Sequence, residues 1–131
     1  MNITFQNDIH DHYLKLTVQG QWVLNEMLAL TEVIKDEAMA AGRDRVFIDF
    51  TAVEGRIPEL DRYSVGVQIA KIWQSKLRVA ILYQADQINK FAENVAVNRG
   101  ARIFVTWSEA DALDWLLRDL KDPPQLSNTE W

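Results

Sequence analysis

Hydrophobic and polar positions alternate near the start of the chain. From Leu14 to Val18 every second residue is apolar, which is the pattern of a strand with one face in water. A shorter predicted strand, 3–6, precedes it, and the residues between the two, 7–11, are rich in turn formers. The two segments therefore predict an antiparallel hairpin, which Gly20 is expected to end.

Three later segments are short and almost continuously apolar, at 46–50, 78–83 and 102–107. Strands that are buried on both faces have this composition. Such strands pair in parallel when helices connect them. The second half of the chain therefore predicts a parallel sheet.

Four other segments repeat apolar residues at helical spacing. Asn25 and Ser108 are good N-caps for the first and last of these segments, and Asp111 stands at the capping-box position of the last. The helices are expected over about 25–41, 58–75, 88–100 and 108–120.

The predicted element order is β-β-α-β-α-β-α-β-α. The fold class that fits this order is α/β, a single-domain mixed β-sheet with helices packed on it. We expect one domain over residues 1–120. Pro123 and Pro124 stop the last helix, so residues 121–131 are expected to form a flexible C-terminal tail.

Composition narrows the function classes. The chain has 131 residues, no cysteine and a formal net charge of −5, which argues for one domain and against disulfides, thiolate metal sites and nucleic-acid binding. No apolar run approaches the ~20 residues that a membrane span needs. The N-terminus lacks a basic segment followed by an apolar one, so no secretory signal is expected and the protein is predicted to be cytoplasmic.

Several segments resemble the STAS domain, the fold of bacterial anti-sigma-factor antagonists of the SpoIIAA type. Segment 46–53 is similar to that family's apolar strand ending in Asp, an apolar residue, a small residue and a turn. Segment 78–82 resembles the family's next strand, and 99–104 with 108–116 resemble its closing strand and helix. The resemblance covers about residues 3–120 and implies a regulatory domain without catalytic residues that works through protein contacts.

The chain departs from that family at the phosphorylated turn. Phosphorylated members carry a short Asp-Ser-Ser-Gly-like turn at the start of the next helix, and its serine accepts the phosphate. The corresponding segment here, 55–60, has no hydroxyl group. Ser64 can be aligned instead, but Pro58 starts the helix and leaves Ser64 more than a turn inside it, where a kinase has poor access. The sequence therefore resembles a side branch of the family without the phospho-switch.

The helix predicted at 58–75 is apolar around about 240° of its circumference, whereas a surface helix needs little more than about 100°. Leu60 and Tyr63 lie on one side of it, and Val65 and Ile69 lie almost opposite. One side must meet the sheet, and the other must meet a neighbouring helix, a bound apolar ligand or another subunit. We predict a surface for a protein partner or a homodimer, formed by the turn after the third strand and this helix. Its residues are Thr51, Glu54, Arg56, Arg62, Val65, Ile69, Ile72 and Trp73.

Candidate metal ligands are sparse. His10 and His12 would share one face of an extended segment, but zinc or nickel needs a third ligand, such as Asp8. The other interpretation of this segment is a solvated turn. No metal or cofactor is therefore predicted.

Two acid pairs, Glu54 with Glu59 and Asp49 with Asp86, are the candidates for acid–base catalysis. Such a role needs an apolar pocket or a close like charge to shift a carboxyl pKa, which the sequence does not show. The only histidines lie in the N-terminal hairpin, so no nucleophile has a neighbouring base. We therefore expect that the protein is not an enzyme.

The turn at 53–56 follows a parallel strand, which is where open α/β sheets place ligands. Arg56 and Arg62 could meet an anion there, although an ordinary surface loop is the other interpretation. STAS-like sheets also resemble lipid-binding relatives of the SEC14 kind. The alternative function is accordingly a carrier of a small apolar, lipid-like molecule held in a groove under the helix at 58–75.

Overall fold

The computed structural model describes residues 2–121. Its elements follow the chain as β1 (Thr4–Ile9), β2 (Leu14–Gln21), α1 (Leu24–Ala41), β3 (Arg45–Glu54), α2 (Glu59–Trp73), β4 (Arg78–Leu82), the short 3₁₀ helix η1 (Ala85–Gln87), α3 (Phe91–Asn98), β5 (Arg102–Thr106), α4 (Glu109–Leu116) and α5 (Arg118–Lys121). None of these helices has the length and apolar content of a membrane-spanning segment.

The five strands form one sheet in the order β1-β2-β3-β4-β5. β1 is antiparallel to β2, and the other neighbouring pairs are parallel. The predicted fold class, a single mixed sheet with helices packed on it, is confirmed. Of the expected tail, residues 122–131 lie outside the described part of the chain, and Lys121 ends α5.

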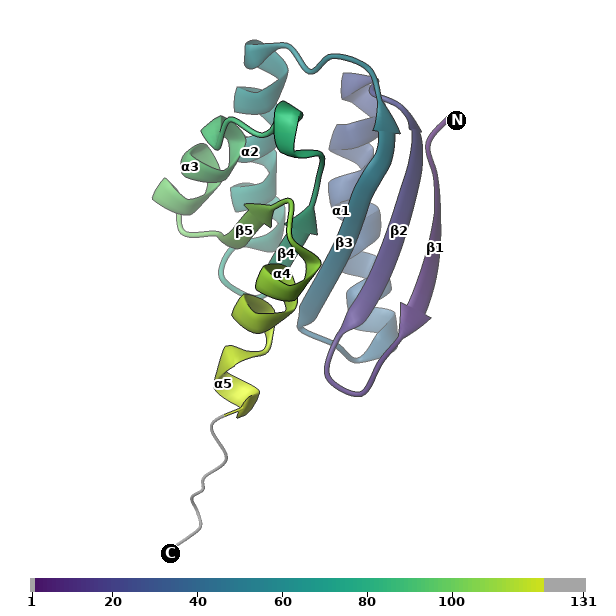
Figure 1. Ribbon diagram of the computed structural model, residues 1–131, viewed down its shortest axis with the longest axis vertical. Coiled ribbons are helices and arrows are strands. Elements are labelled where there is room, and N and C mark those ends of the chain that lie inside the picture. The colour runs from purple at the N-terminus through teal and green to yellow at the C-terminus, as the bar shows by residue number, and fades with distance from the viewer. Residues whose placement is uncertain (1, 122–131) are drawn as a thin grey trace, which may run out of the picture.

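The helices lie on both faces of the sheet (Figure 1). α1, α2 and α3 cover one face, and α4 covers part of the other. Successive strand residues point to opposite faces, so Val46 joins the larger core under α1–α3 whereas Phe47 joins the smaller core under α4. The smaller core consists of Phe47, Ala80, Leu82, Ala112 and Leu116.

β2 and β3 are longer than the sequence predicted. β2 continues through Gly20 to Gln21, so the prediction that Gly20 ends the strand is wrong. Gly20 has a φ of +134°, and a Cβ at this position would lie 2.6 Å from the backbone oxygen of Asn2. Glycine is therefore required here by the close passage of the N-terminal segment, and not because the strand stops.

α1 begins earlier than predicted. Its N-cap is Val23, and Asn25 lies inside the first turn. The backbone N–H of Met27 donates to Val23 O at 3.0 Å. Glu26 serves a different purpose, because its Oε1 accepts the backbone N–H of Ile3 at 2.9 Å and so joins the start of β1 to the start of α1.

The third predicted helix is shorter than expected. Ile88 lies outside it, in extended backbone that follows η1, and α3 starts only at Phe91. Asn89 Oδ1 accepts the N–H of Phe91 at 3.0 Å, and Lys90 adopts a positive φ of 67°. The polar pair at 89–90 therefore makes a turn where the apolar spacing predicted a helix.

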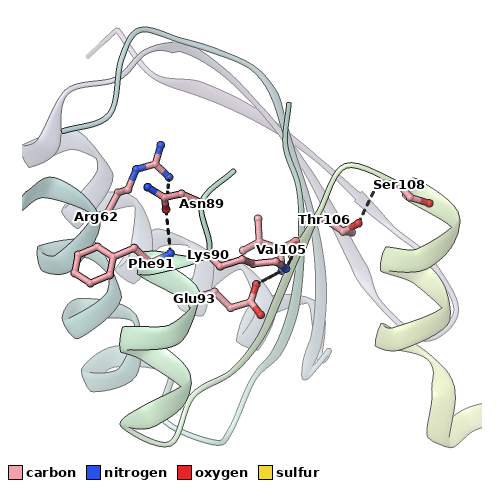
Figure 2. Close-up of polar contacts among 8 residues, drawn as sticks. All are labelled: Arg62, Asn89, Lys90, Phe91, Glu93, Val105, Thr106 and Ser108. Atoms are coloured by element: carbon pink, nitrogen blue, oxygen red, sulfur yellow. Dashed lines mark hydrogen bonds and ion pairs between the residues drawn. The ribbon is translucent and has the colours of Figure 1, made fainter. Parts of the chain in front are cut away.

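The cap of the last helix is confirmed. Ser108 is the N-cap of α4, and its Oγ accepts the N–H of Asp111 at 3.1 Å. Thr106 Oγ1 accepts the N–H of Ser108 at 3.2 Å and fixes the approach to the helix (Figure 2). The predicted helix at 108–120 is interrupted at Leu117, and α5 follows as a separate turn.

Candidate functional site

α2 lies between α1 and α3 (Figure 1). Gly66 makes the approach to α3 possible, because a Cβ there would lie 2.7 Å from Ala92 O and 2.9 Å from Val95 Cβ. Towards α1, Trp73 is only 2% exposed, and its Nε1 donates to Thr31 O at 2.9 Å. Most of the apolar circumference of α2 is therefore covered inside the chain.

The side of α2 that we predicted to face a partner is the covered side. Ile69 and Trp73 belong to the larger core, and Val65 and Ile72 are partly buried against it. The expectation that these four side chains form a free surface is not met, because the chain's own core already covers them. The three alternatives for this face were a neighbouring helix, a bound apolar ligand and another subunit. The structure favours packing within the chain, and the cavity described below lies beside the same face of α2.

The opposite side of α2 is the one that faces outwards. Leu60 is 77% exposed, and Tyr63, three residues later, is also exposed. The Arg99 guanidinium, from the end of α3, lies over the Tyr63 ring at 5.6 Å from its centroid. We call Leu60, Tyr63 and Arg99 the outer patch.

Three of the predicted interaction residues lie at the end of β3 and in the turn that follows. Thr51, Glu54 and Arg56 are exposed. Thr51 Oγ1 donates to Asp49 Oδ1 at 2.7 Å, and Glu54 Oε1 accepts from Gln21 Nε2 at 3.0 Å. Internal contacts thus hold Thr51 and Glu54 in place.

An apolar cavity of about 120 Å³ lies between the sheet and α1, α2 and α3. Its walls are mostly aliphatic and aromatic side chains from all of these elements. Residues that line it include Met27, Leu30, Ile34, Ile48, Phe50, Ile57, Arg62, Val65, Ile69, Trp73, Ile81, Tyr83, Ile88, Asn89, Lys90, Ile103 and Val105.

The cavity meets a polar depression at the surface, and both are lined by Ile57, Arg62, Ile88 and Asn89. Arg56 also lines the depression. The two arginines that the sequence analysis named as possible anion contacts therefore line the same depression. The residues of this mouth come from the segments that follow β3 and β4, at the carboxyl ends of the strands, where α/β sheets bind ligands.

Arg62 lines both the cavity and the depression, and Figure 2 shows it beside Asn89. One of its terminal nitrogens donates to Gln87 O at 2.8 Å, and the other lies 3.4 Å from Asn89 Oδ1. Its Nε is buried and has no hydrogen-bond partner among the described residues. Glu59 Oε1 lies 3.7 Å from Nε, an ion-pair distance that is too long for a hydrogen bond.

Tyr83 lies beside Arg62 in the cavity wall. Burial raises the pKa of its phenol, and the nearby Arg62 charge partly opposes that shift. The Tyr83 ring makes an edge contact with Phe50, which in turn contacts Trp22. Aromatic rings therefore line part of the cavity. Because its pKa is raised, the Tyr83 phenol stays neutral around neutral pH.

Lys90 and Glu93 close the free edge of β5 next to the cavity. Glu93 Oε1 accepts the N–H of Val105 at 2.9 Å, and Lys90 Nζ donates to Val105 O (Figure 2). The two side chains also pair with each other at 2.9 Å. An unpaired strand edge invites pairing with another chain, and this ion pair blocks it at Val105.

The sequence analysis found Arg56 and Arg62 but missed the other residues at the mouth. Tyr83, Ile88 and Asn89 come to this place through the loop after β4, which was assigned to strand and helix ends. The available signal was an apolar residue, Ile88, standing alone among polar ones, because such a side chain in a loop needs a place to be buried.

The other candidates remain separate from this site. His10 Nε2 lies 3.0 Å from Asp8 Oδ2, and its ring stacks on Tyr13. Within residues 2–121 no three His, Asp or Glu side chains are grouped so that they could hold a metal ion. Ser64 is partly buried in the second turn of α2.

The carboxylates of the two acid pairs do not bond to each other, and three of the four contact other neighbours. Asp49 accepts from Thr51, and Asp86 is exposed in η1. Glu54 accepts from a glutamine, whereas Glu59 accepts from Asn89 at 2.9 Å and pairs with Arg62.

Solved structures with a similar fold include the following two. One is an anti-sigma factor antagonist from Mycobacterium paratuberculosis, with a TM-score of 0.58 and 17% sequence identity over 87% of this chain and 93% of that one. The other is an uncharacterized protein from the DUF3478 family with a SpoIIAA-like fold, from Shewanella loihica, with a TM-score of 0.51 and 24% identity over 88% of this chain and 93% of that one. No family model and no curated protein matches the sequence. The chain therefore has a STAS/SpoIIAA-like fold, as the sequence resemblance implied.

Proposed function

We propose that this chain is a non-catalytic, STAS-like regulatory domain of the cytoplasm that binds a protein partner. The contact surface is the outer patch together with the exposed residues Thr51, Glu54 and Arg56. The observation that carries the proposal is the 77% exposure of Leu60 beside the exposed Tyr63.

The composition of the outer patch supports this role. Tyrosine and arginine are enriched at the energetic centres of protein interfaces, and Arg99 already lies over the Tyr63 ring. Leu60 adds an aliphatic side chain one helical turn from Tyr63. One of the solved structures with a similar fold is an anti-sigma factor antagonist, which supports a protein partner as the occupant of such a surface.

Binding is tested with Leu60→Asp and a matched control, Met39→Asp. Both replace a strongly exposed apolar residue on a long helix, but Met39 lies on α1, away from the outer patch. Affinity capture from the native organism should retain a partner with wild-type protein and Met39→Asp, and lose it with Leu60→Asp. Equal capture by all three proteins would place the contact elsewhere.

A homodimer is the form of this proposal in which the partner is a second copy. Light scattering coupled to size-exclusion chromatography measures the mass directly. A dimer that Leu60→Asp dissociates and Met39→Asp leaves intact supports self-association through the outer patch. A monomer at high concentration removes the homodimer and leaves a different protein as the partner.

The second candidate function is the binding of a small apolar molecule. It is favoured by one observation, the apolar cavity under α2. Native mass spectrometry of freshly purified protein tests it, because a carrier should retain part of its ligand. A clean mass without adduct, together with no binding of any apolar probe, would contradict this function.

A further inference from the structure

The cavity under α2 has a size that limits what it can hold. An apolar cavity of about 150 Å³ stays dry and binds one benzene molecule, and the cavity here is about 120 Å³. One aromatic ring or an alkyl chain of about six carbons is therefore the largest apolar group that fits without movement of the walls. A long acyl chain does not fit.

The mouth of this cavity lacks one hydrogen bond. The Arg62 side chain is only 13% exposed, and contacts with Gln87 and Asn89 fix its two terminal nitrogens. Its buried Nε has no acceptor among the described residues. A buried donor without an acceptor is costly, and more so when it is charged.

We propose that the cavity binds a small carboxylate with one short apolar group, such as a six-carbon or a benzoate-like acid. This inference rests on the second proposed function and specifies its ligand. Arg62 Nε is closed off from solvent and lies 3.7 Å from Glu59 Oε1, so the Arg62 side chain turns towards the ligand when a carboxylate oxygen accepts from Nε. The apolar group enters the space between the sheet and α2. The exposed Arg56, which also lines the depression, adds a second positive charge for an incoming anion.

Other ligand classes satisfy the site less well. A pure hydrocarbon fills the cavity but leaves Arg62 Nε with only the long ion pair to Glu59, at 3.7 Å, and no hydrogen bond. An amine places a positive charge against a guanidinium. Glu59 and Asp86 near the mouth oppose an anion in part, which leaves the bond to Arg62 and the burial of the apolar group as the sources of affinity.

Calorimetric titration of the full chain with four probes tests the inference. Hexanoate and benzoate should bind, hexanamide should bind about 10- to 100-fold more weakly, and hexylamine should not bind. The expected difference is that between a charge-assisted hydrogen bond and a neutral one. Decanoate should bind no better than hexanoate, because the cavity has no room for the extra carbons.

Three variants locate the site. Arg62→Gln should reduce hexanoate affinity to the level of hexanamide, whereas Arg56→Gln, at the exposed rim, should change it only a few-fold. Val65→Phe places a ring in the cavity and should abolish binding of both probes. Circular dichroism establishes whether each variant is folded. If Arg62→Gln does not fold, Arg62→Lys replaces it in the test, because lysine keeps the positive charge but has no Nε donor.

The outcomes separate the two claims. Equal binding of hexanoate and hexanamide, or hexanoate binding unchanged in Arg62→Gln, overturns the carboxylate and leaves a carrier of neutral apolar molecules. Tighter binding of decanoate overturns the size limit. No binding of any probe overturns both this inference and the carrier function, while the protein-interaction function stands or falls with the Leu60 variants.

Discussion

The two faces of the sheet are packed in different ways. On one face α4 lies on β3, β4 and β5, and the fully buried Ala80 and Ala112 allow a close approach. On the other face α1, α2 and α3 present large side chains, and a cavity of about 120 Å³ remains among them. Small residues bring a single helix against the sheet, whereas three helices that also pack on one another leave a space at their junction. The α4 face serves stability, and the face under α2 has room for a ligand.

The largest effect is expected at Trp73, one of the largest buried side chains of the helical layer. Trp73→Ala removes a side chain that is almost fully buried and also loses the bond to Thr31 O. Truncations of this kind lower the free energy of unfolding by about 3–5 kcal/mol. Urea denaturation measures the loss, with Trp107→Ala as control because Trp107 is exposed after β5. A loss similar to that of the control would show that the layer is loosely packed throughout.

The next prediction compares the two faces directly. Ala112→Leu adds bulk to the close-packed α4 layer and should lower the free energy of unfolding by about 1–3 kcal/mol. Val65→Ile adds one methylene beside the cavity, where there is space, and should be neutral or stabilising by up to about 1 kcal/mol. Thermal and urea denaturation of both variants decide the point. The reverse order would mean that the spare volume lies under α4.

A smaller effect is expected at the crossing of α2 and α3. Gly66→Ala improves helix propensity by about 1 kcal/mol, but the new Cβ would lie 2.7 Å from Ala92 O. Because the clashing atom is backbone, the two helices must separate, and we expect a net destabilisation of about 1 kcal/mol. Ser64→Ala, on the same helix without such a contact, should not be destabilising. A stabilised Gly66→Ala would show that α3 moves freely.

The sequence predicted the fold well because the spacing of apolar residues and the apolar content of each segment determine the type of element that forms. The near-continuous apolar segments correctly predicted parallel strands, and the hairpin was recognised by alternation. The ends of elements were less accurate. Gly20 was interpreted as a strand end because sequence does not show that Asn2 passes close to it. Ile88 was assigned to a helix because its spacing fits, whereas Asn89 makes a side-chain turn there.

The candidate site was only partly predictable, for a geometric reason. A helical projection of α2 shows two apolar sides but does not say which of them meets the core. The side with Ile69 and Trp73 is buried and the side with Leu60 is exposed, which is the reverse of the expectation. The cavity depends on how three helices meet, and no single segment carries that information. Arg56 and Arg62 were found because the sequence does show that they follow a parallel strand, the place where α/β sheets bind ligands.

The smallest effect is expected at the junction of β1 and α1, which borders the helical face. The hydrogen bond from the Ile3 N–H to Glu26 lowers the pKa of that carboxyl from its ordinary value of 4.5, and bonds from Asn2 add to this against a partial opposition by desolvation. A carboxyl whose pKa is lower in the folded state contributes stability above its unfolded pKa and loses it as the pH falls through the folded pKa. Glu26→Gln keeps an acceptor but removes the charge. Its stability deficit against wild type, measured by urea denaturation from about pH 7 to about pH 3, should be small and constant near neutrality and should shrink below about pH 4.5. A deficit that is the same at every pH would mean that the charge of Glu26 adds nothing, and that the oxygen acceptor alone joins the first strand to the helical layer.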